Sequence, residues 1–130
     1  MIGLSAFFGI GIVIVGVFSC DPGCPQPPLS QAAVIHDRVS PTMFVAILVG
    51  IGLSAVLFRA LPGFRRLWLY SLFSSLLGFA FLMMLLTALS SGGLIGLWQR
   101  LLLATVFLWH VVLSLQRLKL LGIQQETAAQ

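Results

Sequence analysis

Residues 67–89, LWLYSLFSSLLGFAFLMMLLTAL, decide the fold class of this chain, because they contain no Asp, Glu, Lys or Arg. A membrane-spanning helix needs about 20 mainly apolar residues. Three further apolar runs lie on either side, and together they predict spans at about 2–19, 41–59, 67–89 and 94–116. The pattern therefore predicts an all-α transmembrane four-helix bundle with one ordered extracytoplasmic loop, in a single domain over residues 1–130.

The composition supports the membrane class and argues against a water-soluble fold. The 130 residues are 59% hydrophobic and only 8% charged, and their mean hydropathy is +1.10. Soluble domains are about 45–50% apolar and about 25% charged. The net charge of +4 does not indicate nucleic-acid binding, because the sequence has no basic stripe and no aromatic platform. We expect the lipid bilayer as a partner and no nucleic acid.

The second span has two possible starting positions, because Pro41 can either begin the helix or lie inside it. Proline is favoured at the first position of a helix, so Ser40 and Pro41 fit a start there. Proline is also tolerated inside a membrane helix when neighbouring groups satisfy the freed backbone. We favour the second alternative, in which the helix starts near Ser30 and is kinked at Pro41.

The basic residues predict the orientation of the bundle, because cytoplasmic loops carry the excess of Lys and Arg. One side receives five of them (Arg59, Arg65, Arg66, Arg117 and Lys119) and the other receives two (Arg38 and Arg100). This split predicts a multi-pass protein of the cell membrane with both termini cytoplasmic. Residues 117–130 form a cytoplasmic tail in this prediction, and residues 20–38 face the extracytoplasmic side.

Small residues recur at helical spacing in three of the spans. The sets are Ser71, Ser74, Ser75 and Gly78, then Ala46, Gly50 and Ser54, and finally Ser5, Gly9 and Gly16. Small faces let helix backbones approach closely in lipid. We expect these faces to pack within the bundle. Contact with a partner membrane protein or a second copy of the chain is the alternative.

Both cysteines lie in the first loop, separated by Asp-Pro-Gly. This tripeptide favours a tight turn, which predicts a Cys20–Cys24 disulfide on the oxidising side of the membrane. A thiol-exchange enzyme usually has a Cys-x-x-Cys spacing, which this chain lacks. Cleavage or lipidation at Cys20 is the competing interpretation, because an apolar stretch ending in small residues resembles a signal peptide.

Three polar residues of the same region, Asp21, His36 and Asp37, are candidates for catalysis. Their oxygen and nitrogen atoms could hold a divalent metal, with Asp21 and His36 as the candidate ligands, and a metal-activated water could attack a lipid head group. Capping, turn formation and ion pairing are the structural alternative. We predict neither a bound metal nor a cofactor.

The last span carries the intramembrane polar residues Gln99, His110 and Ser114. Ionisable residues inside the membrane face the bundle interior and often serve function. If His110 has such a function, it is a proton relay or a contact with a ligand. The alternative is a neutral histidine that bonds to a serine or a carbonyl. A haem would need a second axial ligand, and the other histidine, His36, lies at the membrane surface.

Several of these motifs together resemble domain-of-unknown-function family 998, a group of prokaryotic multi-spanning membrane proteins. The resemblance covers about residues 11–119. It rests on Phe18-Ser19-Cys20-Asp21-Pro22-Gly23-Cys24-Pro25, Leu29-Ser30, His36, Leu69-Tyr70-Ser71-Leu72 and Gly96-Leu97-Trp98-Gln99-Arg100. It implies a helical bundle, typically six-spanning, with no established activity. This chain resembles the C-terminal four helices of that bundle and lacks the first two spans with the polar loop between them.

The leading functional prediction is a small, non-catalytic membrane protein with an assembly, accessory-subunit or lipid-contact role. The first alternative is a membrane-surface hydrolase or transferase that acts on lipid head groups through Asp21, His36 and Asp37. The second is proton or small-solute transport by an oligomer through His110 and Gln99.

Overall fold

The computed structural model of the protein describes residues 2–25 and 27–128. In this part of the chain all regular structure is helical, with no β-strand. The elements are α1 (Ile2–Val17), α2 (Gln31–Ala60), the short 3-10 helix η1 (Pro62–Leu67), α3 (Trp68–Ser91) and α4 (Ile95–Ala128). The predicted all-α class with four helices is confirmed.

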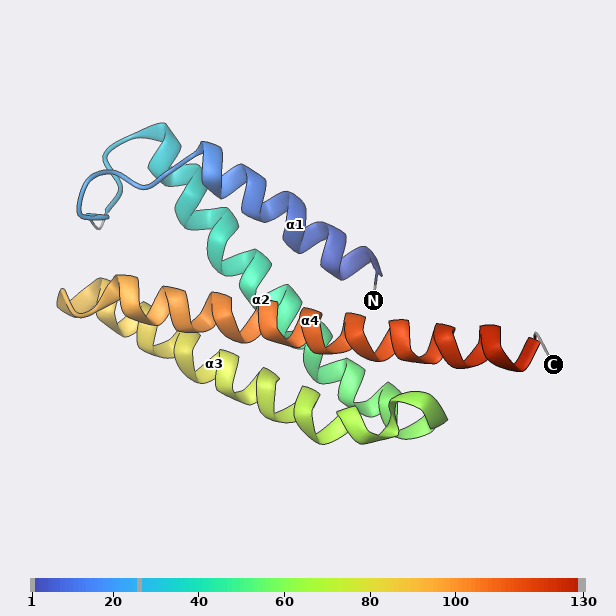
Figure 1. The fold of residues 1–130 in the computed structure, drawn as a ribbon. Helices are drawn as coiled ribbons and strands as arrows, with labels where there is room; N and C mark the ends of the chain where they lie inside the picture. The colour runs from blue at the N-terminus through green and yellow to red at the C-terminus, as the bar shows by residue number, and fades with distance from the viewer. Residues whose placement is uncertain (1, 26, 129–130) are drawn as a thin grey trace.

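Neighbouring helices along the chain pack on each other, α1 on α2, α2 on α3 and α3 on α4. Figure 1 shows the chain running back and forth between two ends of the bundle. The loop before α2 and the turn between α3 and α4 lie at one end, which we call the loop end. The turn at η1 lies at the opposite end, toward which both termini point.

Helix α2 begins at Gln31 and continues through Pro41, so the earlier of the two predicted starts is the one observed. Ser30 is the N-cap, with extended backbone angles, and its Oγ accepts the backbone N–H of Ala33 at 3.1 Å. Such a cap satisfies one of the helix donors that has no partner within the helix. A separate start at Ser40 is therefore wrong.

Helix α4 reaches Ala128, so residues 117–128 of the predicted cytoplasmic tail continue the last helix. Residues 129–130 of the predicted tail lie outside the described residues. Leu, Lys, Arg and Gln dominate residues 115–121, and all four have high helix propensity. The Gln116 side chain also donates to the Gly63 carbonyl at 2.7 Å, which fixes this part of α4 against η1.

The core is apolar and centred on α2, which contributes more buried side chains than any other helix. Its members are Phe8, Met43, Phe44, Ile47, Leu48, Ile51, Phe58, Leu82, Leu85, Leu102, Val106, Trp109 and Leu113. Many large apolar side chains nevertheless remain on the outer surface, on every one of the four helices. A helix that is apolar all round is typical of a membrane span.

The small-residue face of α3 lies inside the bundle, as predicted. Ser71, Ser74, Ser75 and Gly78 are all buried. The Ser75 hydroxyl donates to the Leu48 carbonyl of α2 at 2.9 Å. The face on α1 differs, because Gly9 and Gly16 are exposed and a Cβ added at either would have no neighbour within 4 Å.

Within the described part of the chain, three helical segments are long and apolar enough to cross a membrane, namely Gln31–Ala60, Pro62–Ser91 and Ile95–Gly122. Helix α1 has 16 residues and is therefore about 24 Å long. This is shorter than the hydrocarbon core of a bilayer, about 30 Å. The structure is thus compatible with a multi-pass membrane protein, with α1 as the shortest of its apolar helices.

Candidate functional site

The first loop contains a tight turn that brings the two cysteines together. The backbone N–H of Cys24 donates to the Asp21 carbonyl at 2.8 Å, and Gly23 takes a φ of 82°. Glycine adopts this left-handed conformation without steric cost. Cys20 and Cys24 form a disulfide whose Cα atoms are 5.3 Å apart, within the usual range.

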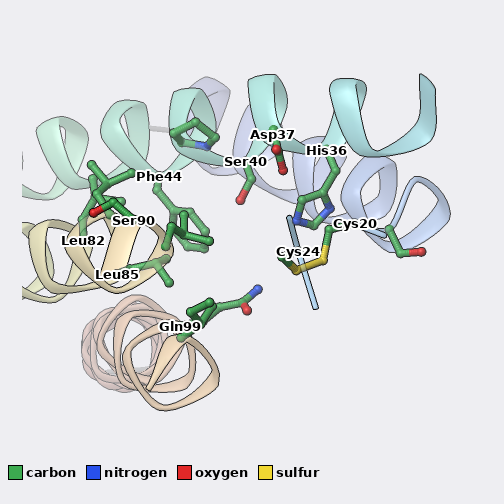
Figure 2. A pocket seen from close by; sticks show the side chains of 15 residues that line it. Cys20, Cys24, His36, Asp37, Ser40, Phe44, Leu82, Leu85, Ser90 and Gln99 are labelled. Carbon is green, nitrogen blue, oxygen red and sulfur yellow. A yellow bond between two sulfur atoms is a disulfide. The ribbon is translucent and has the colours of Figure 1, made fainter. Parts of the chain in front are cut away.

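Beside this turn lies a cavity of about 440 Å³, at the loop end of the bundle between α2, α3 and α4. Its lining consists of Ser19, Cys20, Cys24, His36, Asp37, Ser40, Pro41, Phe44, Leu82, Leu85, Leu86, Leu89, Ser90, Ile95 and Gln99. In Figure 2, His36, Asp37 and Ser40 extend from α2 toward the space that Gln99 enters from α4. The disulfide closes one side.

The cavity is polar at one end and apolar at the other. On α2 its lining runs from His36 and Asp37 to Phe44, a distance of about 12 Å at 1.5 Å per residue. In Figure 2, His36 and the disulfide lie toward one side of the cavity, and Phe44, Leu82 and Leu85 lie toward the other. This arrangement is suited to an elongated molecule with one polar end, because ligand pockets combine apolar walls with a few placed polar groups.

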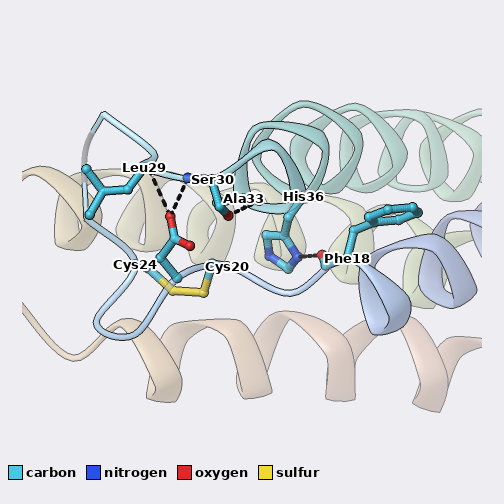
Figure 3. The surroundings of a disulfide bond; sticks show 8 residues. Phe18, Cys20, Cys24, Leu29, Ser30, Ala33 and His36 are labelled. Carbon is cyan, nitrogen blue, oxygen red and sulfur yellow. Dashed lines mark hydrogen bonds between the residues drawn. A yellow bond between two sulfur atoms is a disulfide. The ribbon is translucent and has the colours of Figure 1, made fainter.

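Asp21 bonds to the backbone at the start of α2. Its Oδ2 accepts the backbone N–H groups of Leu29 at 2.9 Å and Ser30 at 3.0 Å, as the dashed lines in Figure 3 show. A side-chain hydrogen bond from Ser30 and the backbone hydrogen bond from Leu29 lower the pKa of Asp21 below its usual value. These bonds to the ionised form attach the disulfide turn to the N-terminus of α2.

His36 joins α2 to the end of α1. Its Nδ1 lies 2.9 Å from the Phe18 carbonyl oxygen (Figure 3). A carbonyl can only accept, so Nδ1 carries the proton, and in the neutral ring Nε2 is then an acceptor. Together with Asp21, His36 fixes both sides of the loop at the edge of the cavity.

The structure brings together some of the predicted site residues. His36, Asp37, Cys20, Cys24 and Gln99 all line the cavity. Asp21 lies outside this lining, with its carboxylate on the loop backbone. Within residues 2–25 and 27–128, no group of three His, Cys, Asp or Glu side chains could hold a metal ion.

Three lining hydroxyls, on Ser19, Ser40 and Ser90, were missed by the sequence analysis. Only Ser40 carried a signal that could have found it. It lies four residues after His36, and residues at this spacing share one face of a helix. Ser19 and Ser90 enter the cavity through the packing of separate segments, which no local pattern indicates.

The other two polar residues predicted on the last span, His110 and Ser114, lie away from the cavity. His110 is half-buried, and its Nδ1 donates to the Val106 carbonyl at 2.9 Å. Its Nε2 lies 3.1 Å from the Ser5 hydroxyl of α1. Both ring nitrogens of His110 therefore have a hydrogen-bond partner, one a serine hydroxyl and the other a backbone carbonyl. Ser114 is exposed.

Comparison with known proteins identifies the family of the chain. The family model described as "Protein of unknown function (DUF998)" matches residues 2–116, so the chain belongs to this family and the predicted resemblance is confirmed. No curated protein and no solved structure matches the chain. The family has no established activity, and the geometry of the site must therefore carry the functional argument.

Proposed function

For this member of a family of unknown function, we propose that it is a non-catalytic membrane protein that holds one single-chain amphiphile in the cavity at the loop end. Three non-catalytic roles were predicted from the sequence, and the cavity supports the role in lipid contact. The hydrocarbon chain lies between Phe44 and Leu82, and the polar end lies beside His36 and Asp37. The gradient of polarity along the cavity carries this proposal.

The orientation of the protein is part of the proposal. The basic residues Arg59, Arg65 and Arg66 all belong to the turn region opposite the loop end, and a cytoplasmic position for them follows the distribution of Lys and Arg in membrane proteins. The cavity then opens near the extracytoplasmic surface. There the polar end of a bound lipid remains in the head-group region while its chain enters the bundle.

The two alternatives have less support from the geometry. A hydrolase that uses Asp21, His36 and Asp37 needs the three side chains around one substrate, and the carboxylate of Asp21 bonds to the loop backbone instead. Transport through His110 and Gln99 needs a polar path between them. Gln99 lines the cavity, whereas His110 bonds to Ser5 on α1.

Binding of tritiated dodecanol to the protein in phosphatidylcholine nanodiscs tests the proposal. We expect saturable binding of one molecule per chain above the signal of empty nanodiscs. Leu89→Trp places a larger side chain in the cavity and should abolish this binding. The matched control is Leu76→Trp on the exposed face of α3, which should keep it. Binding no greater than that of empty nanodiscs, or equal binding by both variants, contradicts the proposal.

A further inference from the structure

The polar end of the cavity is rich in hydrogen-bond acceptors. Asp37 supplies a carboxylate, and His36 supplies Nε2, because its Nδ1–H is directed to the Phe18 carbonyl. The hydroxyl of Ser40 and the amide of Gln99 can accept as well as donate. Among the described residues that line the cavity there is no Lys or Arg.

The nearest basic residues in the sequence lie outside this lining. Arg38 and Arg100 follow Asp37 and Gln99 directly, and both are exposed. Successive residues of a helix point about 100° apart, which is why each arginine leaves the face that its neighbour presents to the cavity. The charge at the polar end therefore comes from Asp37.

We propose, on the basis of the function proposed above, that the polar end of the bound amphiphile is a protonated primary amine. An ammonium group has three N–H donors and no acceptor, which complements the acceptors of Asp37, His36 and Gln99. Hydrogen bonds between ionised partners are about twice as strong as neutral ones. A carboxylate or phosphate head group would instead lie beside Asp37 with no cation in the described lining, and like charges disfavour such a contact.

Asp37 can receive this ligand although it also has an interaction within the protein. A carboxylate offers about four lone-pair positions, so it can accept an ammonium donor in addition to an interaction within the protein. The half-buried position of Asp37 reduces screening by water relative to a fully exposed group. A charge-assisted bond in such a position is worth about tenfold in affinity over a neutral donor.

Competition against tritiated dodecanol on the wild-type protein tests the proposal. The competitors share one chain and differ only in head group, being dodecylamine, dodecyltrimethylammonium, unlabelled dodecanol and dodecanoate. Phosphatidylcholine nanodiscs at mildly alkaline pH keep the amine protonated and the acid ionised without a charged lipid surface. Each apparent affinity is corrected for partitioning into empty nanodiscs.

We expect dodecylamine to displace the tracer at about tenfold lower concentration than dodecanol, for the reason given above. Dodecyltrimethylammonium, which has the charge but no N–H donor, should fall between them, and dodecanoate should be weakest. Dodecanol or dodecanoate binding as well as dodecylamine overturns the proposal. Failure of the tracer to bind at all would instead refute the function proposed above, so the two failures are distinguishable.

Substitutions of Asp37 assign the preference to this residue. Asp37→Asn should bring the ratio of amine to dodecanol affinity close to one, while Asp37→Glu should keep most of it. Asp37→Glu is also the control, because it keeps the negative charge at the same position of the cavity. An unchanged ratio in Asp37→Asn overturns the assignment. Should that variant fail to fold, the wild-type series still decides the proposal.

Discussion

Replacing Ser71 by alanine should weaken the contact between α3 and α4. The indole Nε1–H of Trp109 donates to the Ser71 Oγ at 2.9 Å. Ser71 is 0% exposed and Trp109 is 3% exposed, so neither group meets the surroundings of the bundle. Ser71→Ala removes the acceptor and leaves the indole N–H without a partner in the buried interface.

The size of the effect follows from this burial. A buried donor without a partner costs about 1–3 kcal/mol. Hydrogen bonds between membrane helices contribute less on average, about 0.6 and at most about 1.7 kcal/mol. Because Ser71 is fully buried, we expect a loss of about 1–2 kcal/mol in the free energy of unfolding. Such a loss lowers the ratio of folded to unfolded protein about 5–30-fold.

Reversible unfolding by SDS from lipid bicelles measures this loss. Ser91→Ala is the matched control, because the Ser91 hydroxyl is exposed and bonds within α3 to the Thr87 carbonyl. It should change the free energy of unfolding by less than about 0.5 kcal/mol. In a Trp109→Phe background the cost of Ser71→Ala should shrink, because no indole N–H remains. An equal cost in both backgrounds would refute the role of this hydrogen bond.

Two further predictions concern the packing of α3 and the loop. Gly78→Val should destabilise the bundle by about 1–3 kcal/mol, because a Cβ at this position would overlap the Leu48 side chain, whereas Gly9→Val meets open space and should have little effect in the same SDS titration. The pKa of Asp21 is lowered in the folded loop, so the ionised carboxylate stabilises the loop at pH values above 3.8, the usual pKa of this group. This stabilisation is lost as the pH falls through the folded pKa. Hydrogen exchange of the Leu29 amide, corrected for its intrinsic rate, should therefore accelerate at acidic pH and already be fast at neutral pH in Asp21→Ala. Unchanged protection in that variant would contradict the assignment.

The helices and the disulfide turn were predictable because their signals are local. In apolar surroundings, the backbone N–H and C=O groups of a long apolar run such as residues 67–89 find hydrogen-bond partners within the run only if it forms a helix. The Asp-Pro-Gly segment between Cys20 and Cys24 specifies its own turn. Each signal acts over a few residues, and the observed elements follow it closely.

The element boundaries were less predictable, because contacts between distant segments decide them. The start of α2 near Ser30 is supported by Asp21, which bonds to the backbone of Leu29 and Ser30. The continuation of α4 beyond its apolar run is supported by the bond from Gln116 to Gly63. Neither pairing can be read from spacing, since Asp21 reaches Leu29 and Ser30 across an irregular loop, while Gln116 and Gly63 lie on different elements.

The cavity shows the same limit. Asp21, His36 and Asp37 were grouped because they are polar and close in sequence. The fold separates them, placing His36 and Asp37 on the cavity and directing Asp21 to the backbone. Gln99 joins the site only because α3 returns to the loop end and α4 begins there. The polar residues of the sequence thus indicated the region of the site. Which of them line the cavity is determined by the packing of three helices.

The most direct test of the central claim is to map where an amphiphile chain contacts the protein. Dodecylamine with a diazirine at the end of its chain is photolysed on the protein in phosphatidylcholine nanodiscs, and the adducts are located by mass spectrometry. The account predicts adducts on Phe44, Leu82 and Leu85, at the apolar end of the cavity. Adducts spread over exposed side chains such as Leu69 and Leu76, with none in the cavity, would contradict it.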